Sequence, residues 1–218
     1  TEYVRQSLAI WEELGFEFDA ISTGFIVTEE ETRIISDFCH RRAQKGTKVF
    51  VDPIMGDNGK LYAGVPESTI GLMRHLLECA DYAVPNYTEA CLLADRPIAE
   101  EITPDEGRAL VDAVRELGAK SVVITSAVVN GTNAVIGYDH VAGEYFMIPF
   151  ELIPVYFPGT GDTFSAVLVG RVMAGWSLQR ATSDAMRVVA ELIERNADQE
   201  DKSAGLPIEA CLDVIDHE

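Results

Sequence analysis

The 218-residue sequence is poor in basic side chains, with 17 Lys and Arg against 36 Asp and Glu and a formal net charge of −19. A basic surface supplies most of a protein's nonspecific affinity for nucleic acids and for anionic membranes. The shortage of basic residues therefore argues against both kinds of partner. The acidic residues are spread along the chain, for example at 29–31 and 100–101, which is typical of a solvated surface.

Long apolar runs and paired cysteines are also missing. No apolar run approaches the roughly 20 residues that cross a bilayer, and the first residues do not have the pattern of a signal peptide. The 4 cysteines form no Cys-x-x-Cys pair, and the 4 histidines do not lie at metal-ligand spacing. We therefore expect free thiols and a cytoplasmic location. The sequence contains no internal repeat, low-complexity stretch or domain linker.

The sequence does contain enough apolar residues, at 47%, to build a sizeable core. Its periodicity predicts helices at 2–14, 29–45, 66–79, 103–118, 178–195 and 207–216, with a short one opening at 85–89. Strands are predicted at 18–24, 47–51, 82–84 and 121–125, with a hairpin or edge pair at 133–137 and 145–150. Strands that alternate with helices indicate a mostly parallel sheet covered on both faces.

The segment Pro158-Gly159-Thr160-Gly161-Asp162-Thr163-Phe164 lies where an irregular stretch becomes an apolar helix. Glycines at a helix start let a ligand approach the backbone, and the free N–H groups there attract anions. A carboxylate in this position does not help to bind phosphate, but it suits a base beside a phosphoryl group under transfer. The alternative is that Asp162 is only a first-turn carboxylate that stabilises the helix.

Small and polar residues follow the predicted strands at 22–24, 52–57, 86–89 and 125–126. Ligands of open α/β sheets bind outside the carboxyl ends of the strands, so these segments are candidates for one binding site. Ordinary structural roles remain open for each of them. Asp52 can simply end a strand, Asp57-Asn58-Gly59 can be a turn, and Asn86 with Glu89 fits a capping box.

Three segments in this order resemble the motifs of the ribokinase superfamily: Asp52-Pro53-x-Met55-Gly56-Asp57, Asn86-x-x-Glu89 after Pro85, and Gly159-Thr160-Gly161-Asp162. The resemblance is greatest to the pyridoxal (pyridoxine, pyridoxamine) kinases and extends from Glu2 to about Ile193. It implies a single kinase domain over 1–218 with a three-layer αβα fold and a mostly parallel central sheet. Members of that family carry a further N-terminal segment, so the resemblance also implies a domain that is N-terminally incomplete.

The resemblance implies an activity and a set of roles. The activity is ATP-dependent phosphorylation of the 5′-hydroxymethyl group of a B6 vitamer by a homodimer. Asp162 matches the catalytic base, and the turn Gly159-Thr160-Gly161 matches the anion hole. Mg²⁺ would be held largely through water, and K⁺ would lie near Asp57. The metal-side positions are Asp57, Asn86 and Glu89. The nucleotide-side positions are Asp52, Asp57, Tyr62, Asn86, Ser126, Gly159, Thr160 and Gly161, although Tyr62 could have an ordinary packing role.

Two other functions remain open. The neighbouring hydroxymethylpyrimidine kinases phosphorylate a similar group, but they often have Cys at the position of Asp162, and the Met-Gly-Asp-x-Gly loop also favours a pyridoxal kinase. The other possibility is a nucleotide-binding relative that keeps the fold without turnover.

Overall fold

The chain divides into two compact units, Thr1–Met147 and Ile148–Glu218, and the computed structural model describes residues 1–26 and 28–215. The single domain expected over 1–218 stays a prediction.

The first unit contains most of the secondary structure. Its helices are α1 (Glu2–Glu13), α2 (Glu29–Ala43), α3 (Ser68–Leu77), α4 (Tyr87–Leu93) and α5 (Pro104–Arg115). Its strands are β1 (Ala20–Thr23), β2 (Lys48–Val51), β3 (Gly56–Asp57), β4 (Lys60–Leu61), β5 (Tyr82–Ala83), β6 (Ser121–Val129), β7 (Thr132–Asp139) and β8 (Glu144–Pro149), the last of which ends two residues into the second unit.

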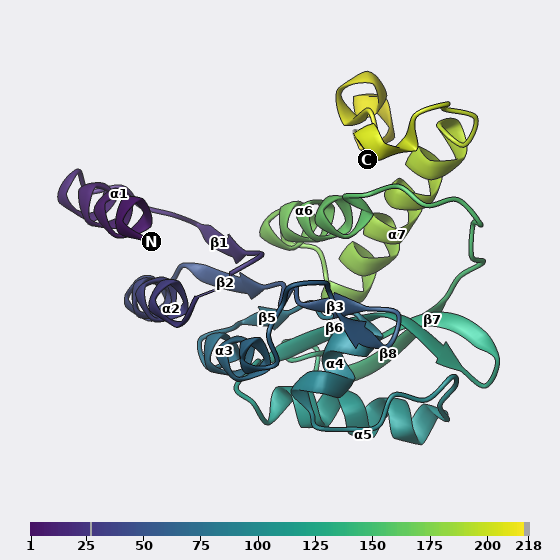
Figure 1. Cartoon of the computed structure of the whole chain (residues 1–218), viewed down its shortest axis with the longest axis horizontal. Coiled ribbons are helices and arrows are strands. Elements are labelled where there is room, and N and C mark those ends of the chain that lie inside the picture. The colour runs from purple at the N-terminus through teal and green to yellow at the C-terminus, as the bar shows by residue number, and fades with distance from the viewer. Residues whose placement is uncertain (27, 216–218) are drawn as a thin grey trace. The chain divides into compact units, whose positions relative to one another are not determined.

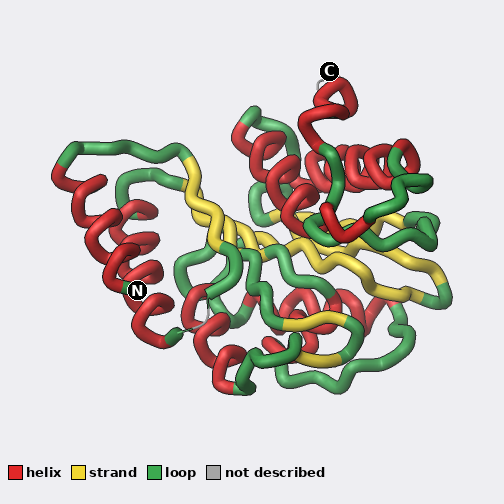
Figure 2. Tube along the Cα trace, turned by 45° about the horizontal axis from the view of Figure 1, so that its top comes forward, coloured by secondary structure: helices red, strands yellow, loops and turns green. Residues whose placement is uncertain are grey.

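The central sheet has six strands in the order β1-β2-β5-β6-β7-β8. The pairs β1–β2, β2–β5 and β5–β6 are parallel, whereas β6 and β7 are antiparallel. Helices α3, α4 and α5 lie on one side of these strands (Figure 1), and the strands form a twisted layer (Figure 2). The mixed α/β fold with a mostly parallel central sheet, predicted from the sequence, is therefore confirmed.

Apolar runs explain why these strands occupy the centre. Val49, Phe50 and Val51 of β2 are at most 1% exposed, and the three residues Val122–Ile124 of β6 are fully buried. A strand covered on both faces has no solvent side, so continuous apolar residues replace the alternation typical of half-exposed strands.

Strand β6 is longer than predicted. The expected end at Thr125 is wrong, because the strand continues to Val129 after a register shift between Ile124 and Ala127. Ser126 has a φ of 60° at this bulge. A β-bulge interrupts the pairing with β7 at Thr125 and Ser126, and the hydrogen-bonded pairing resumes after it. These two polar residues therefore mark an irregularity within the strand. The last two predicted strands are confirmed as β7 and β8, which are neighbours at the edge of the sheet.

The second unit contains helices α6 (Thr160–Met173) and α7 (Leu178–Arg195), followed by the 3₁₀ segments Lys202–Ala204 and Ile208–Val214. The helix predicted at 207–216 is therefore present as a 3₁₀ segment over Ile208–Val214. Cys211 has non-helical backbone angles inside that segment, and Asp216 lies outside the described residues.

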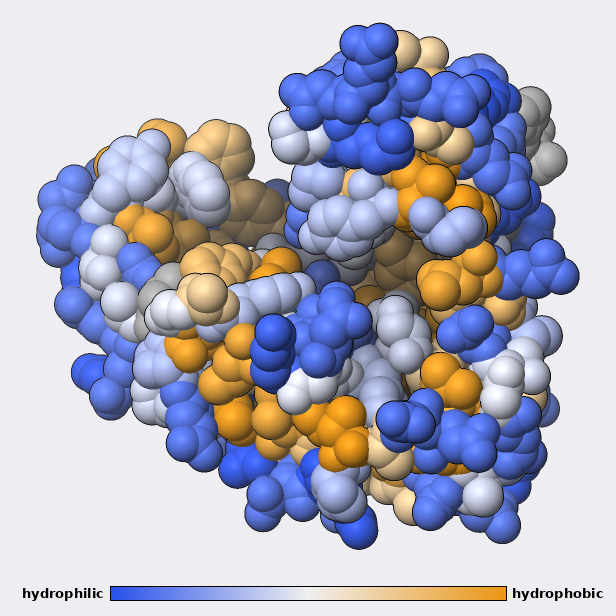
Figure 3. All heavy atoms as spheres, turned by 45° about the vertical axis from the view of Figure 1, so that its right-hand side comes forward, coloured by the Kyte–Doolittle hydropathy of each residue, from blue (hydrophilic) through white to orange (hydrophobic). Residues whose placement is uncertain are grey.

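Hydrophilic side chains are interspersed with apolar ones on the face drawn in Figure 3, in keeping with the dispersed acidic residues of the sequence. Among the helices that the structure describes, none has the length and apolar character needed to cross a bilayer.

Candidate functional site

The polar segments that follow β1, β2, β5 and the first part of β6 lie at the same edge of the sheet, as predicted. Backbone hydrogen bonds continue the ladder beyond the paired strand residues. The amide of Asp52 donates to Thr23 at 3.3 Å, and the amide of Thr125 donates to Pro85 at 3.0 Å. The parallel direction of these strands therefore brings their carboxyl ends together.

The Glu89 carboxylate connects two of the segments at this edge. One carboxylate oxygen accepts hydrogen bonds from the amides of Met55 at 2.9 Å and Gly56 at 3.3 Å, and the other accepts from the amide of Asn86 at 2.9 Å. Asn86 returns the contact, because its side-chain oxygen accepts from the Glu89 amide at 2.9 Å and its Nδ2 donates to the Gly56 carbonyl at 2.8 Å. The capping box that the sequence left open is thus present, and Glu89 also ties the start of α4 to the 55–57 loop.

The environment of Glu89 favours its neutral form. Burial raises the pKa of Glu89 to about 7, against the lowering effect of the amide hydrogen bonds from Asn86, Met55 and Gly56, and the nearby Asp52 carboxylate adds to the rise. A cation placed here would stabilise the ionised carboxylate, because opposite charge lowers a carboxyl pKa.

Residues 55–62 form a small antiparallel hairpin, β3–β4, where the sequence indicated only a loop. Asp57 accepts a hydrogen bond from the Asn58 amide at 2.7 Å, so the turn role that was left open for Asp57 is present. The Gly59 amide donates to the Thr88 hydroxyl at 3.0 Å and thereby anchors the hairpin to α4. Thr88 was not singled out from the sequence, although its place inside Asn86-x-x-Glu89 was the available signal.

The other residues of the first unit that are predicted to bind the nucleotide are Asp52, Tyr62 and Ser126, and they lie near the β3–β4 hairpin or the bulge in β6. The Tyr62 amide donates to the Met55 carbonyl at 3.0 Å, and the Tyr62 side chain is 45% exposed. Asp52 is half-buried beside Glu89, and Ser126 is exposed at the bulge in β6.

The oxygen donors of Asp57, Asn86 and Glu89 are of the kind that Mg²⁺ accepts. Each of the three already accepts a hydrogen bond from a backbone amide. The described residues contain no group of three His, Cys, Asp or Glu side chains suited to hold a metal ion. This donor set fits a hydrated cation held mainly through water better than one enclosed by protein ligands.

In the second unit, the predicted turn opens α6. Gly159 is the N-cap residue with a φ of 84°, a left-handed conformation that glycine adopts without strain. The Thr163 amide makes the first helical hydrogen bond, to the Gly159 carbonyl at 2.9 Å, so the amides of Thr160, Gly161 and Asp162 precede the bonded part of the helix. The Asp162 side chain is exposed in the first turn, and a Cβ added at Gly161 would meet nothing within 4 Å. A ligand can therefore approach the backbone here.

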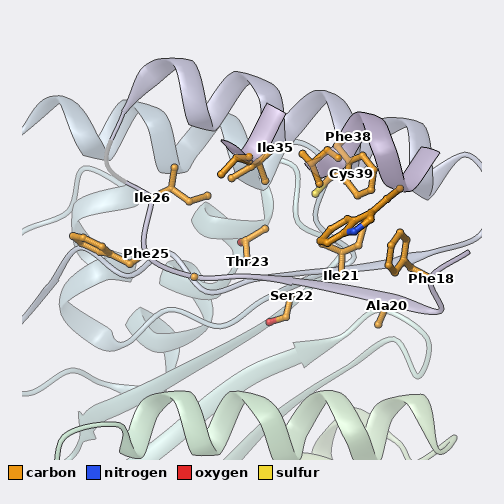
Figure 4. A pocket seen from close by; sticks show the side chains of 14 residues that line it. Phe18, Ala20, Ile21, Ser22, Thr23, Phe25, Ile26, Ile35, Phe38 and Cys39 are labelled. Atoms are coloured by element: carbon orange, nitrogen blue, oxygen red, sulfur yellow. The ribbon is translucent and has the colours of Figure 1, made fainter. Parts of the chain in front are cut away.

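An apolar groove of about 420 Å³ lies beside β1, which is an edge strand. Ile21 and Thr23 point toward α2, while Ala20 and Ser22 point to the other face of the strand (Figure 4). The Thr23 hydroxyl is buried without a hydrogen-bond partner among the described residues, and Phe25 is 56% exposed at one end of the groove.

Comparisons with known proteins agree on the kind of protein that this chain resembles. A family model described as phosphomethylpyrimidine kinase matches residues 2–206. Pyridoxal kinase of Arabidopsis thaliana is 32% identical over 174 residues, which are 75% of this chain and 53% of that protein. The chain spans about half the length of the curated relatives that it matches first.

Solved structures extend the likeness to nearly all of this chain. A Bacteroides thetaiotaomicron protein, provisionally named a phosphomethylpyrimidine kinase, is 32% identical and matches with a TM-score of 0.92 over 98% of this chain and 74% of its own. A second crystal form of that protein, obtained with pyridoxal, is 31% identical and matches with a TM-score of 0.90 over 97% of this chain and 76% of its own.

Proposed function

The chain belongs to the phosphomethylpyrimidine kinase family, and from that premise we propose that it transfers the γ-phosphoryl group of ATP to the 5′-hydroxymethyl group of pyridoxal, pyridoxine or pyridoxamine. The observation that carries the proposal is the start of α6, where an exposed carboxylate, Asp162, stands beside amides that precede the bonded part of the helix. The choice of a B6 vitamer is supported by the related crystal form with pyridoxal.

Phosphoryl transfer depends on positioning and charge stabilisation. In the proposed reaction, the Asp162 carboxylate takes the proton of the substrate hydroxyl while that oxygen attacks the γ-phosphorus, and ADP leaves. The amides of Thr160, Gly161 and Asp162, together with the N-terminal dipole of α6, stabilise the charge that develops on the phosphoryl oxygens. The left-handed Gly159 turns the chain so that these amides face the phosphate.

Polar residues at the strand ends of the first unit have proposed roles of their own. Asp57, Asn86 and Glu89 would hold Mg²⁺, largely through water, and the ion would neutralise phosphate charge. Asp52, Tyr62 and Ser126 are proposed to lie near the nucleotide. A K⁺ ion near Asp57, a homodimer and a cytoplasmic location stay predictions.

The test of the proposed base is Asp162→Asn in the full-length polypeptide. We expect kcat to fall by about 10²- to 10⁴-fold, because loss of a general base removes that much rate, whereas ATP binding persists because the backbone amides remain. Asp105→Asn is a matched control, since Asp105 is a first-turn carboxylate of α5, and we expect its kcat to be unchanged. An Asp162→Asn enzyme with unchanged kcat would remove Asp162 from this role. A full-length protein that binds ATP but does not release ADP would instead support the relative without turnover.

The family description favours one second candidate, a hydroxymethylpyrimidine kinase. Both candidates act on a hydroxymethyl group attached to a heteroaromatic ring, so coupled ADP release should be compared with pyridoxal and with hydroxymethylpyrimidine. Activity with pyridoxal supports our proposal, and activity with hydroxymethylpyrimidine alone overturns it.

A further inference from the structure

The chain contains two Asn-Gly pairs, and each forms the turn of a two-residue β-hairpin. Asn58-Gly59 joins β3 to β4, and Asn130-Gly131 joins β6 to β7. The φ angles are 51° and 79° in the first turn and 48° and 75° in the second, and hairpin turns with two left-handed central residues favour this pair. All four residues are exposed. The two turns therefore share their sequence, nearly the same φ angles and access to water.

The first turn is held by side chains on both sides. The Gly59 amide donates a hydrogen bond of 3.0 Å to the hydroxyl of Thr88 in α4, and Thr88 is only 5% exposed. The Asn58 side chain is held as well, because its Nδ2 donates to the Asp57 carboxylate at 3.1 Å. Both groups that would have to react with each other, the asparagine side chain and the glycine amide, are thus already engaged.

The second turn lacks these restraints. The Asn130 amide donates to the Ile102 carbonyl at 3.0 Å. Within residues 1–26 and 28–215, no hydrogen-bond partner is found for the Asn130 side chain or for the Gly131 amide. Two turns of the same sequence therefore differ in whether the glycine amide is bound.

We propose that Asn130 is a site of spontaneous deamidation, and that the Thr88 hydroxyl protects the equivalent Asn58 from the same reaction. The reaction begins when the amide nitrogen of the following glycine loses its proton and attacks the side-chain carbon of the asparagine. An amide that donates its proton to a buried hydroxyl must first break that hydrogen bond. The Gly59 amide meets this barrier, and the Gly131 amide does not.

The overall reaction consumes water and releases ammonia. The glycine nitrogen forms a bond to Cγ of the asparagine, the Cγ–Nδ2 bond breaks, and Nδ2 leaves as ammonia with the proton that the glycine amide gave up. Water then opens the resulting succinimide ring, giving its hydroxyl to a carbonyl carbon and a proton back to the glycine nitrogen. The product is aspartate if the bond from Cγ to this nitrogen breaks, and isoaspartate if the main-chain bond breaks.

The protected turn is the one that adjoins the candidate functional site. Conversion of Asn58 would add a negative charge next to Asp57, and isoaspartate would lengthen the backbone of a hairpin that Thr88 anchors to α4. The importance of this protection rests on the proposed function, in which Asp57 lies near the metal. The difference in reactivity between the two turns does not rest on it.

The test is peptide mapping of the native, wild-type protein during prolonged incubation at mildly alkaline pH, with enzymatic methylation of isoaspartate to locate the product. We expect aspartate and isoaspartate to accumulate at Asn130 while Asn58 stays intact. Asn133 precedes alanine and is the internal control, which should also stay intact. In the urea-unfolded protein, both Asn-Gly pairs should convert at similar rates, because the hydrogen bond to Thr88 is lost.

Two variants test the protection by Thr88. Thr88→Val removes the hydroxyl at nearly constant volume and should raise the conversion rate of Asn58 by about 2- to 10-fold, the factor that one hydrogen bond supplies. Thr88→Ser is the matched control, because it keeps a hydroxyl, and its Asn58 should convert as slowly as in the wild type.

The proposal is overturned if Asn58 converts as fast as Asn130 in the native wild-type protein, if neither converts, or if the difference persists in the unfolded chain. It is also overturned if a folded Thr88→Val protein keeps Asn58 intact. Both sites are read in the same wild-type molecule, so the comparison decides the matter even where a variant does not fold. Peptide mapping requires no kinase activity, and failure of the proposed function would leave its result unchanged.

Discussion

Glu89 and Glu106 occupy the same capping position in two helices, yet their different surroundings give the two carboxylates different structural roles. Both are the third helical residue of a capping box, with Asn86 and Thr103 as the respective N-cap residues. Glu106 is exposed, and its carboxylate accepts hydrogen bonds from the amide and the hydroxyl of Thr103. Glu89 is 3% exposed and also accepts the amides of Met55 and Gly56. The same local motif is thus a simple helix cap in α5 and a connection between two segments in α4.

We predict that Glu89→Ala lowers the free energy of unfolding by about 2 to 4 kcal/mol, because it leaves buried amides without acceptors. Glu106→Ala is the matched control and should cause a markedly smaller loss, since water replaces the carboxylate there. Urea unfolding of both variants in the presence of EDTA measures the difference without any bound metal. Equal losses in the two variants would show that Glu89 acts only as a helix cap.

The edge formed by β7 and β8 depends on close contact between elements. Gly137 of β7 lies opposite Val123 of β6. A Cβ added at Gly137 would meet the Val122 carbonyl oxygen at 2.5 Å and would collide with the Phe146 ring of β8. The absence of a side chain at Gly137 therefore lets β6, β7 and Phe146 pack together, because backbone atoms cannot move aside cheaply.

We predict that Gly137→Ala destabilises the protein by about 1 to 3 kcal/mol through overpacking. Gly71 provides the control, because it is an exposed glycine of α3 with nothing within 4 Å of an added Cβ. Gly71→Ala should raise stability by about 0.5 to 1 kcal/mol, since alanine favours the helix. Thermal and urea unfolding of both variants measure the opposite signs, and a neutral Gly137→Ala would contradict the packing argument.

At the scale of the whole chain, the second unit is held together by ion pairs as well as by apolar contacts. Asp184 of α7 accepts hydrogen bonds from Arg171 of α6 at 2.7 Å and from Arg187 at 2.9 Å. Arg171 also donates to the Ile215 carbonyl at 2.5 Å. Burial alone would raise the pKa of Asp184, but the two arginines hold it below its usual value. Asp184 thus joins α6, α7 and the C-terminal segment electrostatically.

We predict that Asp184→Asn lowers the stability of the second unit by about 1 to 3 kcal/mol at pH 7. A depressed carboxyl pKa contributes stability above the unfolded value of about 4, and this contribution is lost as the pH falls through the folded value. The difference from the wild type should therefore be constant above about pH 5 and should shrink below about pH 4.

The two tryptophans lie in different units, so tryptophan fluorescence can follow the unfolding of one unit separately from the other. Trp11 lies in α1, whereas Trp176 lies in the second unit under the guanidinium groups of Arg171 and Arg180, at 4.9 and 3.6 Å from its ring centroid. Urea unfolding in a Trp11→Phe background, followed by fluorescence, reports on Trp176 alone. Asp198→Asn, at an exposed position, is the control for the loss of one negative charge. A difference that persists undiminished at pH 3 would show that the charge of Asp184 is not its source.

The sequence by itself determined the class of fold and the location of the polar segments. Apolar runs at 47–51 and 121–125 predict buried strands because a strand inside a parallel sheet needs apolar residues on both faces. Parallel strands share the direction of their carboxyl ends, so the segments at 52–57 and 86–89 were expected at one edge. The glycine turn at 159–161 was visible because only glycine adopts its backbone angle without strain.

Only the tertiary structure decided how these residues contact one another. Periodicity does not encode partners distant in the chain, so the sequence could not show that the Glu89 carboxylate accepts hydrogen bonds from the amides of Met55 and Gly56. The bulge at Ser126 was likewise hidden, because pairing with β7 resumes the strand after it. Local propensity predicts elements, whereas burial and long-range hydrogen bonds, which exist only after folding, set the environment of each side chain.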